Sequence, residues 1–163
     1  MSEIYSIMEN AVAISQYELE RGKPMPSLNH GSVQTNLVIE LAPFRKKYRI
    51  ATELSLDLDD WESVPDICIY PFIPLDTKND VVTMMKPPLC AVEIISPSQS
   101  LTTLVAKANA YFKHGVQSCW LVLLGLDNIY VYTDPDNYDI FKANETLHDT
   151  KLDISFPLTE VFK

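Results

Sequence analysis

Two short apolar runs on either side of a helical segment constrain the fold of this chain most strongly. CAVEII (90–95) and SCWLVLLG (118–125) have the length and composition of buried strands. Residues 99–114 between them show helical spacing, and His114-Gly115 is a favourable helix end. The expected core stripe of that helix is Leu101, Leu104, Val105, Ala108 and Phe112. A strand–helix–strand unit of this kind needs a crossover connection, so we expect two parallel strands and a right-handed crossover.

The remaining patterns predict two helices nearer the N-terminus and several more strands. Helical spacing covers residues 3–15 and about 30–41, where Pro43 ends the second helix. Apolar and polar residues alternate from 48 to 58, which predicts one half-buried strand. Further strands are expected at 66–70, 128–134 and 138–143, with a loop at 72–88. The expected architecture is a mixed α/β sheet flanked by helices.

Length and composition favour a single soluble domain. The chain has 163 residues, which is enough for one substantial core. No apolar run approaches the ~18 residues of a membrane span, and the acidic N-terminus lacks the basic start of a signal peptide. Cys68, Cys90 and Cys119 all lie in apolar runs, so we expect three buried thiols in a reducing cytoplasm. The net charge of −9 counts against non-specific binding of nucleic acid.

Asp66 and Glu93 are the carboxylates that strand geometry singles out. Side chains alternate between the two faces of a strand, so Asp66 shares a face with Cys68, and Glu93 shares one with Ala91. If the two strands are neighbours, the carboxylates lie side by side and need a neutralising partner. One candidate is a hard cation such as Mg²⁺. The alternative is structural: Glu93 pairs with a buried Arg or Lys, and Asp66 only begins a strand.

Several segments, in order, resemble one protein family. They are YELERGKPMPSLNHGSVQ, VPDICIYP, AVEIISPSQS, KANAYFKHGVQSCWLVL and IYVY. Together they resemble the Uma family, small bacterial proteins classed as candidate endonucleases with a restriction-endonuclease-like fold. The resemblance covers residues 14–163. It implies one domain with an N-terminal helix at about 3–15, a catalytic core at about 17–125 and a C-terminal β tail at about 126–163.

The wider nuclease class carries a Pro-Asp…(Asp/Glu)-x-Lys motif, and the resemblance assigns roles on that basis. It implies that Asp66 and Glu93 bind Mg²⁺ or Mn²⁺, with Glu18 as a further ligand. Ile95 stands where the motif lysine is expected, so the resemblance implies Lys107 in the following helix as the catalytic lysine. Lys107 lies about 110° from the centre of the core stripe and can flank the packed face. The chain has Thr103 where the family often has Asp.

Other polar residues have both a functional and a structural interpretation. His30 and Gln34 share a helix face and are candidate substrate contacts, although a surface or capping role is equally expected for them. Ser96 and Ser98 are candidate phosphate contacts, and the structural interpretation is that Ser96-Pro97-Ser98 ends the strand and caps the next helix. For Glu53 we expect a solvated or ion-paired role.

The expected activity is metal-dependent hydrolysis of phosphodiester bonds in DNA by a homodimer. The alternative is a catalytically inactive, dimeric binding module on the same fold, which the −9 charge, Ile95 and Thr103 favour. An enzyme acting on a small phosphorylated substrate also fits the acidity. Arg45, Lys46, Lys47 and Arg49 form either a basic patch or a solvated corner.

Overall fold

The computed structural model describes residues 26–95 and 99–163. The helix expected at 3–15 lies outside this part of the chain, and so do Glu18, Ser96 and Ser98. None of the described helices is long and apolar enough to cross a membrane.

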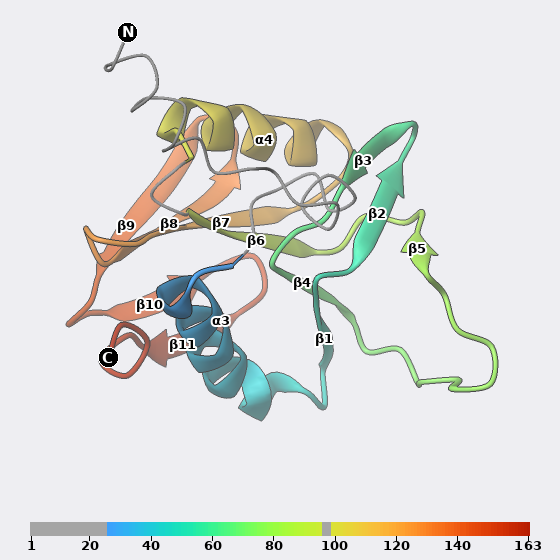
Figure 1. Cartoon of the computed structure of the whole chain (residues 1–163), viewed down its shortest axis with the longest axis horizontal. Helices are drawn as coiled ribbons and strands as arrows, with labels where there is room; N and C mark the ends of the chain where they lie inside the picture. Colours follow the sequence, from blue (N-terminus) through green and yellow to red (C-terminus); the bar gives the residue numbers. More distant parts are fainter. Residues whose placement is uncertain (1–25, 96–98) are drawn as a thin grey trace, which may run out of the picture.

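A six-stranded sheet forms the centre of the molecule (Figure 1). Its order is β1-β4-β6-β7-β8-β9. The strands are β1 (Tyr48–Thr52), β4 (Ile67–Pro71), β6 (Cys90–Ile95), β7 (Ser118–Leu123), β8 (Asn128–Asp134) and β9 (Asn137–Lys142). β6 and β7 pair in parallel, whereas the other neighbours are antiparallel. The predicted mixed sheet and its parallel pair are therefore confirmed.

The two described helices cover opposite faces of this sheet, as Figure 1 shows. α3 (Leu28–Leu41) buries Val33, Leu37 and Leu41 in the cluster that contains Ile67 and Val92. α4 (Leu101–Lys113) buries its own stripe in a second cluster on the other face. We call these the α3-side and α4-side clusters. Because successive strand residues alternate between the clusters, each sheet residue can be assigned to one helix by its position.

Both described α-helices begin after a serine that caps the first turn. α3 begins after Ser27, whose hydroxyl accepts a hydrogen bond from the amide of His30. It ends at Leu41 and continues into the short 3₁₀ helix η1 (Ala42–Phe44), which contains Pro43. α4 is capped by Ser100, which accepts from the amide of Thr103. The expectation that Ser96-Pro97-Ser98 caps this helix is therefore wrong, because the helix begins after a serine further along the chain.

The core stripe of α4 begins one turn later than predicted: Leu104 and Ala108 are buried, Val105 and Phe112 are partly buried, and Leu101 is not. Leu101 is 46% exposed, since burial on this face begins at Leu104 in the next turn. The stripe then continues through Ala108 to Tyr111, which is fully buried. Tyr111 was not predicted as a core position, and it becomes important for the candidate site.

The predicted strand at 48–58 is wrong as a single element. It is divided into β1 and β2 (Ser55–Leu58), which belong to different sheets. β2 forms a three-stranded sheet with β3 (Trp61–Ser63) and with β5 (Thr83–Met84), which lies in the predicted loop at 72–88. Glu53 has φ 54°, a left-handed conformation that breaks the extended chain. Tyr48 before the break packs in the α3-side cluster, whereas Leu56 after it packs in the α4-side cluster.

The C-terminal segment after β9 forms a separate two-stranded sheet, whereas β8 and β9 belong to the central sheet. β10 (Thr146–Asp149) and β11 (Ile154–Pro157) pair as an antiparallel hairpin that packs into the α3-side cluster. Cys68, Cys90 and Cys119 are free and buried, as predicted from their apolar runs. Burial raises the pKa of the Cys68 thiol to about 12, so the group is protonated and unreactive at neutral pH.

Candidate functional site

The pairing of β4 with β6 brings Asp66 and Glu93 together. Ile67 lies opposite Val92 in this antiparallel ladder, so Asp66, one residue earlier, faces Glu93. Cys68 and Ala91 share faces with these carboxylates and both belong to the α4-side cluster. Glu93 therefore lies on the α4 side of the sheet. Asp66 directly precedes β4, and its side chain contacts α3 instead. Asp66 is 1% exposed and Glu93 is 2% exposed.

Glu93 is held by two side chains from one face of α4. Lys107 Nζ lies 2.7 Å from Glu93 Oε1, and the Tyr111 hydroxyl donates to the same oxygen at 2.7 Å. Lys107 and Tyr111 are four residues apart, which places them one above the other on the helix. Within residues 26–95 and 99–163, Glu93 Oε2 receives no hydrogen bond. The carboxylate thus has one fully used oxygen and one that a further ligand can approach.

Tyr111 links Glu93 to the small second sheet. Its hydroxyl lies 2.6 Å from the Ser63 hydroxyl in β3, and its ring forms a T-shaped pair with Trp61 at a centroid distance of 5.0 Å. Burial, and secondly the charge of Glu93, raise the pKa of the Tyr111 hydroxyl. Tyr111 therefore remains a hydrogen-bond donor at neutral pH.

Asp66 contacts both α3 and β6. His30 Nε2 lies 3.2 Å from Asp66 Oδ1, and the backbone amide of Ile94 donates to Oδ2 at 2.7 Å. The Gln34 amide donates to the Asp66 carbonyl at 2.8 Å and to Glu53 Oε1 at 3.3 Å. His30 and Gln34 thus contact the candidate metal ligand Asp66. Their role as substrate contacts stays a prediction.

Three residues of this arrangement were not assigned to the site from the sequence. Tyr111 could have been found from helix geometry, because it lies one turn after Lys107 on the same face. Ser63 gave no signal, since β3 itself was not predicted. Glu53 was expected to be solvated or ion-paired, and the structure places it half-buried beside Gln34.

The chemistry of the donor set fits a hydrated divalent cation. Mg²⁺ prefers oxygen ligands and commonly binds through one or two carboxylates while keeping several waters. Asp66 and Glu93 supply such a pair. Among the described residues no group of three or more His, Cys, Asp or Glu side chains is arranged to hold a metal, and Glu18, the expected third ligand, lies outside them. The fit therefore rests on two carboxylates and solvent.

The basic residues near β1 do not gather at this pair. Tyr48 pairs with Pro71, and Thr52 pairs with Ile67, so the start of β1 lies at the far end of the ladder from Asp66. Arg49 there donates to the Ile73 carbonyl and lies over the Phe72 ring. The segment 45–49 therefore forms a structural corner remote from the carboxylates.

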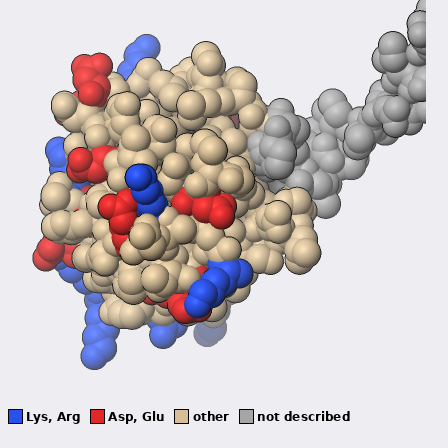
Figure 2. All heavy atoms as spheres, turned by 90° about the vertical axis from the view of Figure 1, so that its left-hand side faces the viewer, with Lys and Arg blue, Asp and Glu red and all other residues tan. Residues whose placement is uncertain are grey.

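Charges of both signs are mixed on the face of the molecule that Figure 2 shows. Figure 2 shows Lys and Arg side chains interspersed with Asp and Glu, with uncharged surface between them. This described face carries no continuous basic surface for a polyanion.

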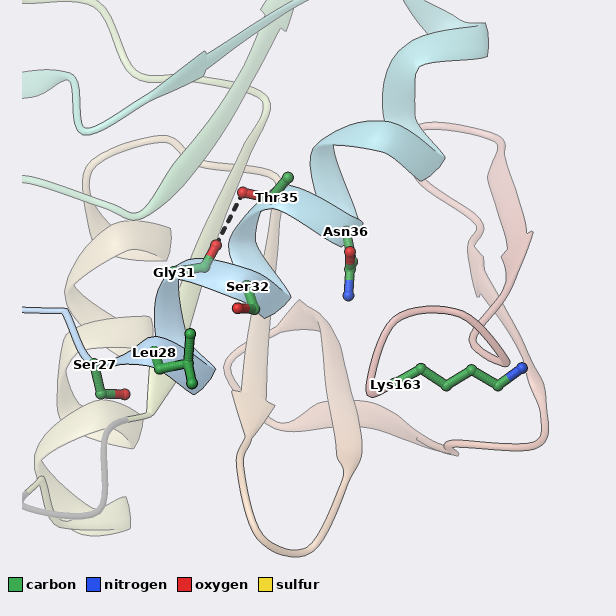
Figure 3. Close-up of a pocket in the computed structure, with 7 residues that line it drawn as sticks. All are labelled: Ser27, Leu28, Gly31, Ser32, Thr35, Asn36 and Lys163. Carbon is green, nitrogen blue, oxygen red and sulfur yellow. Dashed lines mark hydrogen bonds between the residues drawn. The ribbon is translucent and has the colours of Figure 1, made fainter.

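A shallow hollow lies on the outer side of the first turns of α3 (Figure 3). Three of its polar side chains are already used within the protein. Thr35 donates to the Gly31 carbonyl, Asn36 donates to the Val161 carbonyl, and Lys163 pairs with Glu160. None of the predicted site residues lines the hollow, so we assign it no role.

Comparison with known proteins agrees with this fold. The model of the Uma2 family, described as "Putative restriction endonuclease", matches residues 5–159. Among solved structures, a crystal structure of a "putative nuclease" of DUF820 from Anabaena variabilis matches with a TM-score of 0.72 and 24% identity. The match covers 85% of this chain and 83% of that one, and it establishes the fold. No curated protein sequence matches significantly. Since the family model spans nearly the whole sequence, this chain belongs to the Uma2 family.

Proposed function

We propose that this protein is an endonuclease that hydrolyses phosphodiester bonds in DNA with the help of Mg²⁺ or Mn²⁺. One observation carries the proposal. Two buried carboxylates lie at one end of the β4–β6 ladder, Glu93 in β6 and Asp66 directly before β4, and a lysine lies 2.7 Å from Glu93. Family membership supports a nuclease, whereas the metal and the DNA substrate are our inference.

Asp66 and Glu93 would hold the cation, and Glu18 is the further ligand implied by the family resemblance. A divalent ion at this position supplies Lewis-acid stabilisation of the phosphate oxygens. His30 and the Ile94 amide keep Asp66 oriented through separate oxygens. The carboxylate pair is therefore positioned before any ligand arrives.

Lys107 would orient the attacking water and offset the negative charge that develops on the phosphate. Its side chain is 25% exposed while it contacts Glu93, so the ammonium group lies at the border between the core and solvent. A long, flexible stem allows the ammonium group to reach a phosphate without any movement of the helix backbone.

A second function is favoured by other observations. Ile95, at the usual position of the motif lysine, is 8% exposed and packs in the α4-side cluster. The net charge is −9, and the basic corner at 45–49 is remote from the carboxylates. These features suit a non-catalytic, dimeric binding module, or an enzyme that acts on a small phosphorylated substrate rather than on DNA.

The test is cleavage of supercoiled plasmid with Mn²⁺ by wild type and by Glu93→Gln. The glutamine keeps the side-chain volume and an acceptor for Tyr111, but it removes the charge that binds the cation. We expect nicking by wild type and no nicking above background by the variant. Glu62→Gln, which changes an exposed carboxylate in β3, is the matched control and should retain activity.

A homodimer is proposed for cleavage of both strands, so linear product should follow nicked circles as protein concentration rises. Equal activity of wild type and Glu93→Gln would indicate a contaminating nuclease. Inert wild type that melts cooperatively would exclude the DNA endonuclease and favour the binding module.

A further inference from the structure

We propose that Tyr111 is a positioning residue that fixes the Glu93 carboxylate so that Oε2 is the oxygen presented to the cation. This inference rests on the proposed function and names a residue that acts through Glu93. Tyr111 itself is fully buried and does not reach the substrate side.

The first argument is that the two Glu93 oxygens differ in their hydrogen bonding. Tyr111 and Lys107 both contact Oε1, each at 2.7 Å, and Oε2 receives no hydrogen bond from the described residues. Two donors on one oxygen resist rotation of the carboxylate, because rotation would break both contacts. The remaining oxygen, Oε2, is then held at a fixed place.

The second argument is the direction of the hydrogen bonds. A tyrosine hydroxyl has one hydrogen, and Tyr111 donates it to Glu93. The contact of 2.6 Å between Ser63 and Tyr111 must therefore have Ser63 as its donor. The chain of donors runs from Ser63 through Tyr111 to Glu93, and its members are all buried. Hydrogen bonds that are linked in a buried chain polarise one another, so each bond is stronger than it would be alone.

The third argument is the difference between the two partners of Oε1. Lys107 is partly exposed on a flexible stem, so it can leave Glu93 when a phosphate arrives. The Tyr111 ring is fixed in a T-shaped pair with Trp61, with an interplanar angle of 80°. Tyr111 is therefore the partner that keeps Glu93 in place while Lys107 contacts substrate.

The test compares two tyrosine-to-phenylalanine variants of the full chain by calorimetric titration with MnCl₂ alone. Tyr48 is the matched control, because it is also buried and its hydroxyl donates to the Leu152 carbonyl at 2.6 Å on the α3 side. Tyr48→Phe loses one buried hydrogen bond and Tyr111→Phe loses two, so both should melt at lowered temperatures, Tyr111→Phe the lower. We expect Tyr111→Phe to raise the Mn²⁺ Kd about tenfold. Tyr48→Phe should leave the Kd unchanged.

Ser63→Ala supplies a second variant. It should raise the Kd by about threefold, since it removes one hydrogen bond that acts only through Tyr111. Adding Ser63→Ala to Tyr111→Phe should raise the Kd no further. If Tyr111→Phe fails to fold, an unchanged Kd in Ser63→Ala overturns the inference.

The outcomes separate this inference from the proposed function. An equal Kd for wild type and Tyr111→Phe, with Glu93→Gln binding weakly, overturns the positioning role and leaves the metal site intact. Wild type that binds Mn²⁺ but does not nick DNA contradicts the endonuclease, and the two tyrosine variants still decide the inference. Wild type that binds no Mn²⁺ overturns both.

Discussion

Asp149 is a buried carboxylate that links the central sheet to the C-terminal hairpin. It is fully buried and accepts hydrogen bonds from the Ser118 hydroxyl, the Trp120 indole and the amides of Lys151 and Leu152. These donors join β7 of the central sheet to the turn after β10. Replacing Asp149 by Ala leaves the Trp120 indole and the two amides without their acceptor, and it leaves the Ser118 hydroxyl only the Tyr132 carbonyl at 3.3 Å. We expect the free energy of unfolding to fall by about 4 kcal/mol, measured by urea denaturation at neutral pH.

The control for this prediction is Asp139→Ala, which removes an exposed carboxylate from edge strand β9. Its effect should stay within about 0.5 kcal/mol. A loss below about 1 kcal/mol for Asp149→Ala would show that the four donors find other partners.

At the same scale, the sequence predicted the acids of the candidate site better than their supports. Asp66 and Glu93 follow from strand alternation, which a one-dimensional pattern contains. The contacts of Lys107, His30 and Gln34 depend on where helices cross the sheet edge, and alternation does not record this. Ser63 could not be predicted, because its contact requires β3 to fold against α4.

Alanine is expected to have opposite effects on stability at Gly31 in α3 and at Gly115 after α4. Gly31 lies within α3, and a Cβ added there meets nothing within 4 Å. Gly115 follows α4 at φ 96°, where a Cβ would lie 3.2 Å from Pro87 Cγ. We expect Gly31→Ala to stabilise the protein by about 0.5 kcal/mol, because alanine has the better helix propensity. Gly115→Ala should destabilise it by about 1–2 kcal/mol, since an L-residue is strained in this conformation.

Melting temperatures of the two alanine variants check these signs. Shifts in the same direction would contradict the argument from backbone conformation. An increase for Gly115→Ala in particular would mean that the turn after α4 relaxes to negative φ.

Elements were predictable where sequence period and tertiary position agree. The run at 90–123 has buried strands at both ends and a helix with one apolar face, so each pattern has one interpretation. The alternation at 48–58 continues through Glu53 without a visible interruption. A left-handed residue is usually signalled by Gly, Asn or Asp, and Glu53 carries no such signal. The change of face at this residue was therefore invisible, and so was the second sheet that depends on it.

The whole molecule buries several groups that ionise only at high pH. Burial raises the pKa of the Cys68 thiol from its ordinary value of 9.0 to about 12, and burial also raises the pKa values of Cys119 and Tyr111. These groups stay protonated in the folded protein while the unfolded chain ionises. The unfolded state then binds fewer protons, so the free energy of unfolding falls as pH rises. For Cys68 this stability is complete below pH 9 and is lost towards about pH 12.

We therefore expect the melting temperature to be constant from pH 7 to 8 and to fall progressively above pH 9. Each group contributes a slope of about 1.4 kcal/mol per pH unit once its unfolded form is ionised. Cys68→Ala should melt lower at pH 7, because it leaves a cavity, but its stability should depend less steeply on pH. Asp139→Ala should keep the wild-type slope.

Repulsion within an acidic chain is the competing cause, since the net charge of −9 becomes more negative as pH rises. Salt separates the two causes. About 0.5 M NaCl screens repulsion between surface charges but leaves the burial of a thiol unchanged. A pH dependence that persists in salt and becomes shallower in Cys68→Ala supports the buried groups. A dependence that salt abolishes, with wild type and Cys68→Ala equally steep, would assign alkaline unfolding to the net charge instead.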